Sequence, residues 1–319
     1  DPNAVVTAMA TQARHASRQH ARAIARHRPQ ALADARPAHI SQPPDTERQR
    51  WCALVSQATD TIGAQTLEKV VLARDVSVDA PKGARFDVGA TVRQLRHRHD
   101  NAFVFCIGGP NRGYFVGATP ETLIRLHDGD IVETQVLAGT TRRGQNLAED
   151  DALGRALMES AKDRHEHAVT ANAIRQALAP LCRQLDLPNE PRLVRLRRLI
   201  HLETPVVGRL HQRQDVLTLV ERMHPTPAVG GLPRDPALQW LEAHEGMDRG
   251  WYAAPLGWVG AEGDGVFAVA IRSALIHKHR AHTFAGAGIV AASDPEMEWR
   301  ETGLKLQTAG GALVVGEDR

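Results

Sequence analysis

Four carboxylates occur as two pairs with helical spacing. Asp163 and Glu166 are three residues apart in one segment of helical character, and Glu298 and Glu301 have the same spacing in another. Residues three apart lie on one face of an α-helix, so two such faces brought together would present four carboxylates. That donor set suits Mg²⁺. Basic residues stand beside both pairs, however, and spacing alone favours two solvated helix faces with local ion pairs.

Lys69 stands between apolar neighbours in a Val-rich segment that is typical of a strand. A lysine usually lies at an edge or a strand end with its ammonium group in water, so exposure is the expectation from residue type. A lysine buried near other cations can instead lose its proton and act as a base. The sequence alone leaves both positions of Lys69, exposed and buried, open.

Three segments of small residues could line a ligand site. FAGAGI at 284–289 and LAGTT at 137–141 each follow or end a predicted strand, and their backbone N–H groups could approach a ligand carboxylate. Tight packing between strands explains them equally well. Neither is a GxGxxG sequence opening a βαβ unit, so a dinucleotide site is not expected. HPTPAVGG at 224–231 is either a turn or a wall of the site.

Composition excludes several classes of protein. The 319 residues are 42% hydrophobic and 24% charged, with 39 Lys and Arg against 37 Asp and Glu. These values are typical of a globular protein, and the near-neutral balance gives no general reason to expect a nucleic-acid partner. No apolar run approaches the roughly 20 residues of a membrane-spanning helix. Three scattered cysteines without CxxC spacing argue for a reducing compartment, so we expect a cytoplasmic protein. His165-Glu166-His167 is too compact for a zinc site on a helix.

The expected elements describe an α+β fold. Strands joined mainly by hairpins, with helices in separate blocks, predict large antiparallel β-sheets packed together, with helices on the outside. Helices are expected over 51–63, 86–97, 148–185, 216–223, 236–244 and from 295 onward. Strands are expected over 67–78, 102–107, 114–116, 121–126, 131–137, 193–202, 256–260, 266–276 and 282–289.

The N-terminal part differs from the rest, which predicts a basic arm and Pro-containing linker over 1–45 and one compact domain over 46–319. Arg14, Arg18, Arg22 and Arg26 would form one stripe on a helix. A nucleic-acid contact or a targeting peptide could use such a stripe, but a peripheral helix with a solvated face is favoured. A basic-arm binding protein on an inactive scaffold is the alternative of a different class.

Eight segments, taken in chain order, resemble one family, the chorismate-utilising enzymes, which include isochorismate, salicylate, anthranilate and aminodeoxychorismate synthases. The resemblance covers about 46–313, and it is strongest to the isochorismate synthases. It implies the fold of anthranilate synthase component I and a chorismate-binding catalytic domain over 46–319. The segments are KVVLAR (69–74), GATPETLIR (117–125), LAGTTRRG (137–144), KDRHEH (162–167), MHPTPAVGG (223–231), FAVAIRSA (267–274), FAGAGIV (284–290) and EWRETGLKL (298–306).

The resemblance implies Mg²⁺-dependent conversion of chorismate to isochorismate, an isomerase reaction that adds a hydroxyl at C2 and expels the one at C4. Such an exchange needs a base to activate water and an acid to protonate the leaving group. By resemblance, Lys69 is the base and Glu121 the acid. Anthranilate synthases usually carry Gln where Lys69 stands and Thr where Ala228 stands, so both residues favour water as the nucleophile.

The resemblance also implies the remaining site residues. Glu166 and Glu301 would bind Mg²⁺ directly, and Asp163 and Glu298 would be outer-shell partners; several relatives carry Glu in place of Asp163. Substrate contacts are implied for Gly139, Thr140, His201, Ala228, Arg272, Gly286 and Lys305. The expected protein is a monomer acting on a small molecule, in siderophore or menaquinone biosynthesis. Salicylate synthase, which goes on to eliminate pyruvate from isochorismate, is the alternative within the family.

Overall fold

The computed structural model describes residues 36–37 and 44–317. The Arg14–Arg26 stripe therefore lies outside the described residues. The first helix of the described part, α2 (Asp45–Gly63), begins directly after Pro44 and buries Trp51, Val55 and Ile62. No helix in this part of the chain is both long and apolar enough to span a bilayer.

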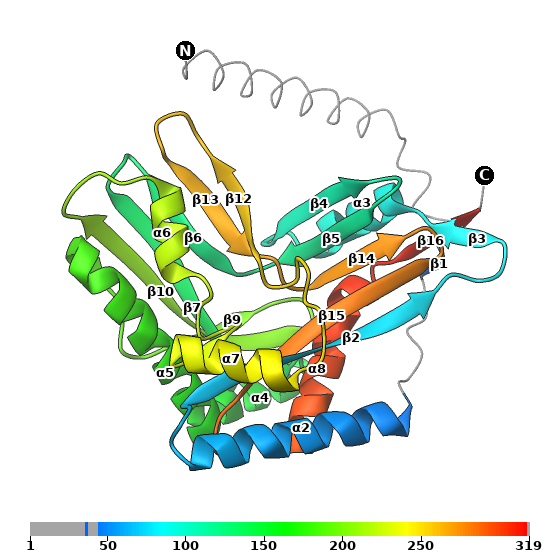
Figure 1. The fold of residues 1–319 in the computed structure, drawn as a ribbon, viewed down its shortest axis with the longest axis horizontal. Coiled ribbons are helices and arrows are strands. Elements are labelled where there is room, and N and C mark those ends of the chain that lie inside the picture. The colour runs from blue at the N-terminus through cyan, green and yellow to red at the C-terminus, as the bar shows by residue number, and fades with distance from the viewer. Residues whose placement is uncertain (1–35, 38–43, 318–319) are drawn as a thin grey trace.

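Two large antiparallel sheets form the centre of the molecule and stand beside each other in Figure 1. One has the order β12-β13-β6-β7-β10-β8, with β9 beside β10, and the other has the order β11-β2-β15-β14-β5-β4. The strands of the first are β6 (Thr122–His127), β7 (Ile131–Arg142), β8 (Cys182–Asp186), β9 (Arg192–Arg195), β10 (Leu199–Leu210), β12 (Pro255–Val259) and β13 (Gly265–Val269). Those of the second are β2 (Lys69–Asp79), β4 (Phe103–Gly109), β5 (Gly113–Thr119), β11 (Gly231–Leu232), β14 (Ser273–His277) and β15 (Arg280–Ile289). A small third sheet joins β1 (Arg36–Pro37), β16 (Val314–Glu317) and β3 (Ala84–Phe86).

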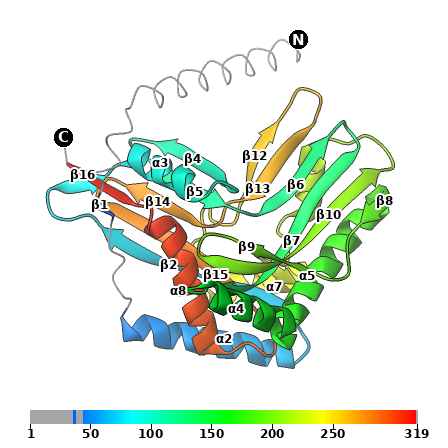
Figure 2. The same cartoon turned by 180° about the vertical axis from the view of Figure 1, so that it is seen from behind.

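Helices cover the sheets from outside, as the sequence predicts. In Figure 2, α4 (Leu147–Glu159) and α5 (Ala161–Leu178) lie on the seven-stranded sheet, and α8 (Pro295–Gly310) crosses the six-stranded one. α5 buries Ile174 and Leu178 in the core near its C-terminal end, which leaves its first turns beside the two sheets. The other helices are α3 (Val88–Arg98) on β5, α6 (Val216–Met223) on β6 and α7 (Arg234–His244) on β2 and β11.

The chain crosses between the two sheets at two adjacent places. β5 and β6 belong to different sheets and are joined by Pro120 and Glu121, and β13 and β14 are joined by residues 270–272. The N–H of Val269 donates to the Glu121 carbonyl at 3.1 Å, and the N–H of Ala118 donates to the Arg272 carbonyl at 3.3 Å. These bonds hold Glu121 and Arg272 side by side at the junction of the sheets.

The prediction of one strand over 266–276 is therefore wrong. The apolar sequence continues without a turn signal, but Arg272 has a φ of 54° and the strand ends on either side of it. A positive φ is uncommon for a residue with a side chain and breaks the extended backbone. The break turns the chain from the seven-stranded sheet into the six-stranded one.

Two further element predictions are wrong. The expected helix over 148–185 is two helices separated at Ser160, whose side chain caps α5 by accepting the N–H of Asp163 at 3.2 Å. The end of that segment is strand β8. The expected strand over 193–202 is a hairpin, in which residues 196–198 connect β9 to β10. Helix caps and short turns rest on a few residues, and the apolar pattern does not show them.

Candidate active site

Lys69 is the first residue of β2, and its side chain has no exposed surface. Its Nζ donates to the Thr170 hydroxyl at 3.0 Å and lies 3.1 Å from Glu166 Oε1. Both partners come from α5, where Thr170 Oγ1 donates to the Glu166 carbonyl at 3.0 Å. The exposed position that is usual for a lone lysine is not found. Instead, the ammonium group is buried between a strand and a helix.

Gly288 on β15 provides the space for this pair. It lies opposite Val71 of β2, the strand that carries Lys69. A Cβ atom at Gly288 would overlap Glu166 Oε1 and would lie 2.7 Å from Lys69 Cε. The lack of a side chain at Gly288 therefore leaves room for the Glu166 carboxylate beside Lys69.

α5 and α8 bring the two carboxylate pairs together. Glu166 and Glu301 line one cavity, and Glu166 and Glu298 are buried. Lys162 links the helices, because its Nζ lies 2.9 Å from Glu298 Oε1 and 3.9 Å from Asp163 Oδ1. The interpretation as two separate solvated faces does not fit this arrangement, although each helix does carry lysine ion pairs.

The carboxylates differ in their affinity for protons. Burial, with the nearby charge of Glu301, raises the pKa of Glu298 to about 7. Burial also raises the pKa of Asp163 above its ordinary value. Burial alone would raise the pKa of Glu166, but the positive charges of Lys69, Lys162 and Lys305 outweigh it and lower the pKa. The cluster therefore holds negative charge only because lysines compensate it.

The oxygen ligands that this carboxylate cluster offers suit a hard divalent cation. All four side chains offer carboxylate oxygens, and both Glu298 oxygens are buried without a hydrogen-bond partner in the described part of the chain, although Lys162 is within ion-pair distance. No three His, Cys, Asp or Glu side chains among the described residues already form a ligand set. Lysines neutralise the carboxylates here: Glu301 pairs with Lys305 at 2.5 Å. A cation bound here would compete with these lysines for the carboxylates.

One cavity collects most of the residues that the sequence analysis singled out. α5 and α8 form one side of this cavity. The opposite side is formed by both crossings between the sheets, by β7 and by the loop before β11. The lining residues of this group are Glu121, Gly139, Thr140, Glu166, His201, Ala228, Arg272, Gly286, Glu301 and Lys305. Lys69 adjoins the cavity through Glu166, and Asp163 and Glu298 lie behind it, joined by Lys162.

Glu121 faces this cavity from the sheet junction and is buried. Burial raises its pKa to about 7, although the positive charges of Arg272, Lys69 and Lys305 act in the opposite direction. The carboxyl group is therefore partly protonated at neutral pH. This is the state that a general acid needs before it reacts.

His201 and Arg272 form a buried pair on the same wall. His201 Nδ1 lies 2.9 Å from the Thr140 hydroxyl, and its Nε2 lies 3.4 Å from Arg272 Nη2. Since a guanidinium group can only donate, Nε2 accepts and Nδ1 carries the proton. Burial and the charges of Arg272 and Lys305 hold the pKa of His201 well below its ordinary value, so the ring is neutral.

Three residues near the cavity escaped the sequence analysis as functional candidates. Thr170 positions Lys69, Lys162 bridges the carboxylates, and Tyr252 lines the cavity. Burial raises the pKa of the Tyr252 phenol to about 12, so it stays protonated. Thr170 stands one helical turn after Glu166, which is the signal that could have identified it.

Two antiparallel sheets thus meet at a cavity lined by helix carboxylates, Arg272 and Lys305, with the buried Lys69 beside it, an arrangement whose positive side chains suit a small anion. The chain belongs to the chorismate binding enzyme family, whose model matches residues 2–314. The family assignment made from the eight motifs is thereby confirmed.

The relatives in this family include several isochorismate synthases. The chain is 47% identical over 267 residues to a salicylate biosynthesis isochorismate synthase of Pseudomonas aeruginosa, covering 84% of this chain and 55% of the relative. It is 37% identical over 276 residues to isochorismate synthase MenF of Bacillus subtilis, covering 86% of this chain and 57% of the relative. The chain thus spans little more than half the length of these relatives.

Solved structures confirm the predicted fold. A putative 2,3-dihydroxybenzoate-specific isochorismate synthase, DhbC from Bacillus anthracis, superposes with a TM-score of 0.80 at 34% identity, covering 85% of this chain and 73% of that one. Anthranilate synthase component I from Streptococcus pneumoniae has the same fold, with a TM-score of 0.73 at 24% identity, covering 93% of this chain and 65% of that one.

Proposed function

We propose that this chain converts chorismate to isochorismate with Mg²⁺, as an isomerase. The observation that carries the proposal is the placing of a buried lysine and a part-protonated glutamate around one cavity that also holds Arg272 and Lys305. The names of the relatives point to the same activity. In this reaction one water enters at C2 and one water leaves from C4, so the substrate and product have the same composition.

Lys69 is the base of this proposal. Lys69 forms an ion pair with Glu166 in the structure, and the base of the proposal is its neutral form, in which the amine keeps two N–H groups and one lone pair. The two N–H groups match the two acceptors beside Nζ, Thr170 Oγ1 at 3.0 Å and Glu166 Oε1 at 3.1 Å. The lone pair is then free to take a proton from the water that attacks C2.

Glu121 is the acid. Its proton passes to the C4 hydroxyl as the C4–O bond breaks, which releases water and leaves a carboxylate. The positive charges of Arg272, Lys69 and Lys305 act on Glu121 and stabilise that carboxylate. A well-placed acid or base accelerates such a step by about 10²- to 10⁴-fold.

Arg272 and Lys305 bind the substrate carboxylates in this proposal. Lys305 is fixed by its bond to the Gly286 carbonyl at 2.9 Å, and Arg272 by the sheet crossing and His201. Glu166 and Glu301 would hold Mg²⁺, with Asp163 and Glu298 behind them. When bound, the cation would neutralise the charge of the ring carboxylate and of the surrounding glutamates.

Product analysis tests the proposal. The purified chain is incubated with chorismate, with Mg²⁺ or with a chelator, and the products are separated by chromatography while pyruvate is assayed. Isochorismate that forms only with the metal, without pyruvate, is the expected result. Salicylate with stoichiometric pyruvate would assign the chain to the salicylate synthases instead.

A further inference from the structure

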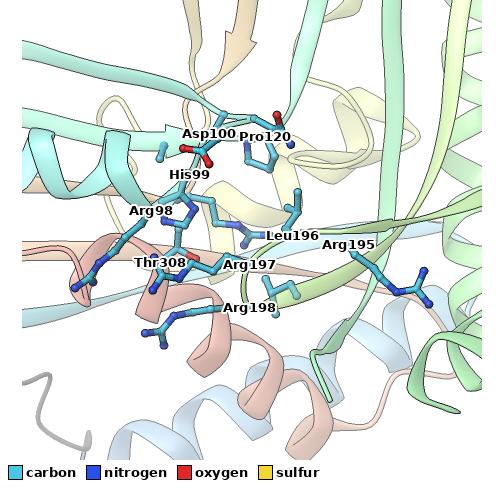
Figure 3. Close-up of a pocket in the computed structure, with 14 residues that line it drawn as sticks. Arg98, His99, Asp100, Pro120, Arg195, Leu196, Arg197, Arg198 and Thr308 are labelled. Carbon is cyan, nitrogen blue, oxygen red and sulfur yellow. The ribbon is translucent and has the colours of Figure 1, made fainter. Parts of the chain in front are cut away.

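A second pocket lies beside the active-site cavity and is rich in arginine. Its wall is formed by the connection from α3 to β4, the β5–β6 crossing, the β9–β10 turn and α8 (Figure 3). The charged residues of this wall are Arg98, Arg195, Arg197, Arg198, Arg272 and Asp100. The lining of the pocket thus includes five arginines and one carboxylate.

The positive charge of this pocket is only partly compensated. Arg195 forms ion pairs with Asp150 at 3.1 Å and Asp151 at 2.9 Å, and in Figure 3 it points away from the other labelled side chains. Arg197 and Arg198 are exposed, and no described carboxylate lies within ion-pair distance of either. The pocket therefore presents two free guanidinium groups to an incoming anion.

The neighbouring histidine responds to this field. Burial, together with the charges of Arg197, Arg98 and Arg198, lowers the pKa of His99 to about 4. His99 is neutral at physiological pH as a result, and it adds no positive charge. An anion in the pocket would relieve the repulsion among the arginines.

The pocket and the active-site cavity share a wall. Arg272 lines both of them. Pro120 lines the pocket and the next residue, Glu121, lines the cavity, while Thr308 of α8 stands one turn after Lys305. Three separate segments therefore line both the arginine pocket and the cavity.

We propose that this arginine pocket captures the dicarboxylate substrate and passes it to Arg272. The inference rests on the proposed function, because chorismate supplies the two negative charges. Clefts lined by one sign of charge concentrate ligands of the opposite sign, and the effect weakens as salt screens it. Arg197 and Arg198 set the rate or affinity of capture, and they take no part in the chemical step.

A charge-deletion experiment tests this role. The variant Arg197→Ala/Arg198→Ala is compared with the control Arg112→Ala/Arg222→Ala, which removes the same charge from exposed positions. Arg112 precedes β5, at the end of that strand opposite Pro120, and Arg222 lies in α6. kcat and kcat/KM for chorismate are measured at low and at high ionic strength.

We expect kcat/KM of the pocket variant to fall about three- to tenfold at low salt, with kcat unchanged and the difference lost at high salt. Arg197→Lys/Arg198→Lys should restore most of kcat/KM, since it keeps the charge. Thermal unfolding checks that each variant folds. An equal loss in the control, or no loss in the pocket variant, would overturn the inference.

Two more outcomes distinguish this inference from a separate anion site and from a failure of the proposed function. If inorganic phosphate lowers wild-type kcat and the pocket variant is insensitive to it, the pocket is a separate anion site and the inference is wrong. If the wild-type chain does not convert chorismate, the proposed function fails, and calorimetric binding of chorismate takes the place of kinetics. Capture would then be supported if the pocket variant, but not the control, binds chorismate more weakly than the wild type at low salt and equally well at high salt. Binding equal to that of the wild type at low salt would refute it.

Discussion

Lys69 on β2 and Glu166 on α5 form an ion pair of 3.1 Å in which the lysine is wholly buried. The proposed base and a proposed metal ligand thus neutralise each other in this structure. Removing one member of a buried pair leaves the other charge without compensation, which costs about 3–5 kcal/mol. The pair therefore links the stability of the site to its chemistry, and substitutions must be chosen to separate the two.

Lys69→Gln should separate them. The amide retains N–H donors for Thr170 and Glu166 but cannot take a proton from water, so kcat should fall by about 10²-fold or more while KM changes little. Lys69→Ala should also lower the free energy of unfolding by about 3–5 kcal/mol. Steady-state kinetics and thermal unfolding measure both effects, with the exposed Lys82→Gln as the control. Wild-type kcat in Lys69→Gln would show that Lys69 is not the base.

Glu121 predicts a loss of activity at alkaline pH. Because the acid must start protonated and its pKa is about 7 in the free protein, log kcat/KM should fall above pH 7 with a slope approaching −1. Glu121→Gln should abolish this limb and lower kcat by about 10²- to 10⁴-fold. A pH–rate profile over 5.5–9 measures it. An alkaline limb that persists in the variant would assign the titration to another group.

The raised pKa of Glu121 also determines how the stability of the folded chain changes with pH. Between the ordinary pKa of a glutamate and about pH 7, the folded chain keeps a proton that the unfolded chain has released. Stability from this group therefore falls as pH rises through that window. Relative to the wild type, Glu121→Gln should gain unfolding temperature from pH 5 to pH 8. A constant difference across this range would contradict the assignment.

Mg²⁺ should stabilise the folded chain. A ligand that binds only the folded state at 100 times its Kd adds about 2.7 kcal/mol, and a chelator should reverse the gain. Glu301→Gln should lose most of the Mg²⁺-dependent rise in unfolding temperature, whereas the exposed Glu262→Gln should keep it. Differential scanning calorimetry supplies the readout without substrate. An equal rise in both variants would place the cation elsewhere.

Gly288→Ala should lower activity by a steric effect alone. The added methyl group would overlap Glu166 Oε1 and approach Lys69 Cε, so the carboxylate has to move and activity should fall at least tenfold. Gly303→Ala in α8 is the matched control, because its Cβ would have only Arg74 Nη2 nearby, at 3.9 Å. That helical substitution should add about 0.5–1 kcal/mol of stability. Full activity in Gly288→Ala would show that the close approach is unnecessary.

The sequence predicted the fold class well, because strand-forming apolar segments and hairpin turns recur along the chain. The mistakes came at places where a few residues decide. Ser160 ends one helix and caps the next, and Arg272 breaks an apolar strand with a single positive φ. Apolar periodicity reports which residues are buried, and it does not report where one buried element turns into another.

The candidate site was predicted from motif order, not from spacing. Spacing alone favoured solvated carboxylates and an exposed lysine, because desolvation depends on what packs on both faces of a segment. The arginine pocket could not be predicted either, since Arg98, Arg197 and Arg272 come from three distant segments. Arg197 and Arg198 also lie in a turn that the sequence analysis placed inside a strand.

The central claim, that Lys69 activates a solvent water for attack at C2, is tested most directly by isotope transfer. The chain is incubated with chorismate and Mg²⁺ in H₂¹⁸O, and the isochorismate formed is analysed by mass spectrometry and NMR. We predict one solvent-derived ¹⁸O atom at C2 of each product molecule, and product formation by Lys69→Gln that is slower by about 10²-fold or more. Isochorismate that retains only ¹⁶O would mean that the hydroxyl migrates within the molecule, which would contradict the role of Lys69.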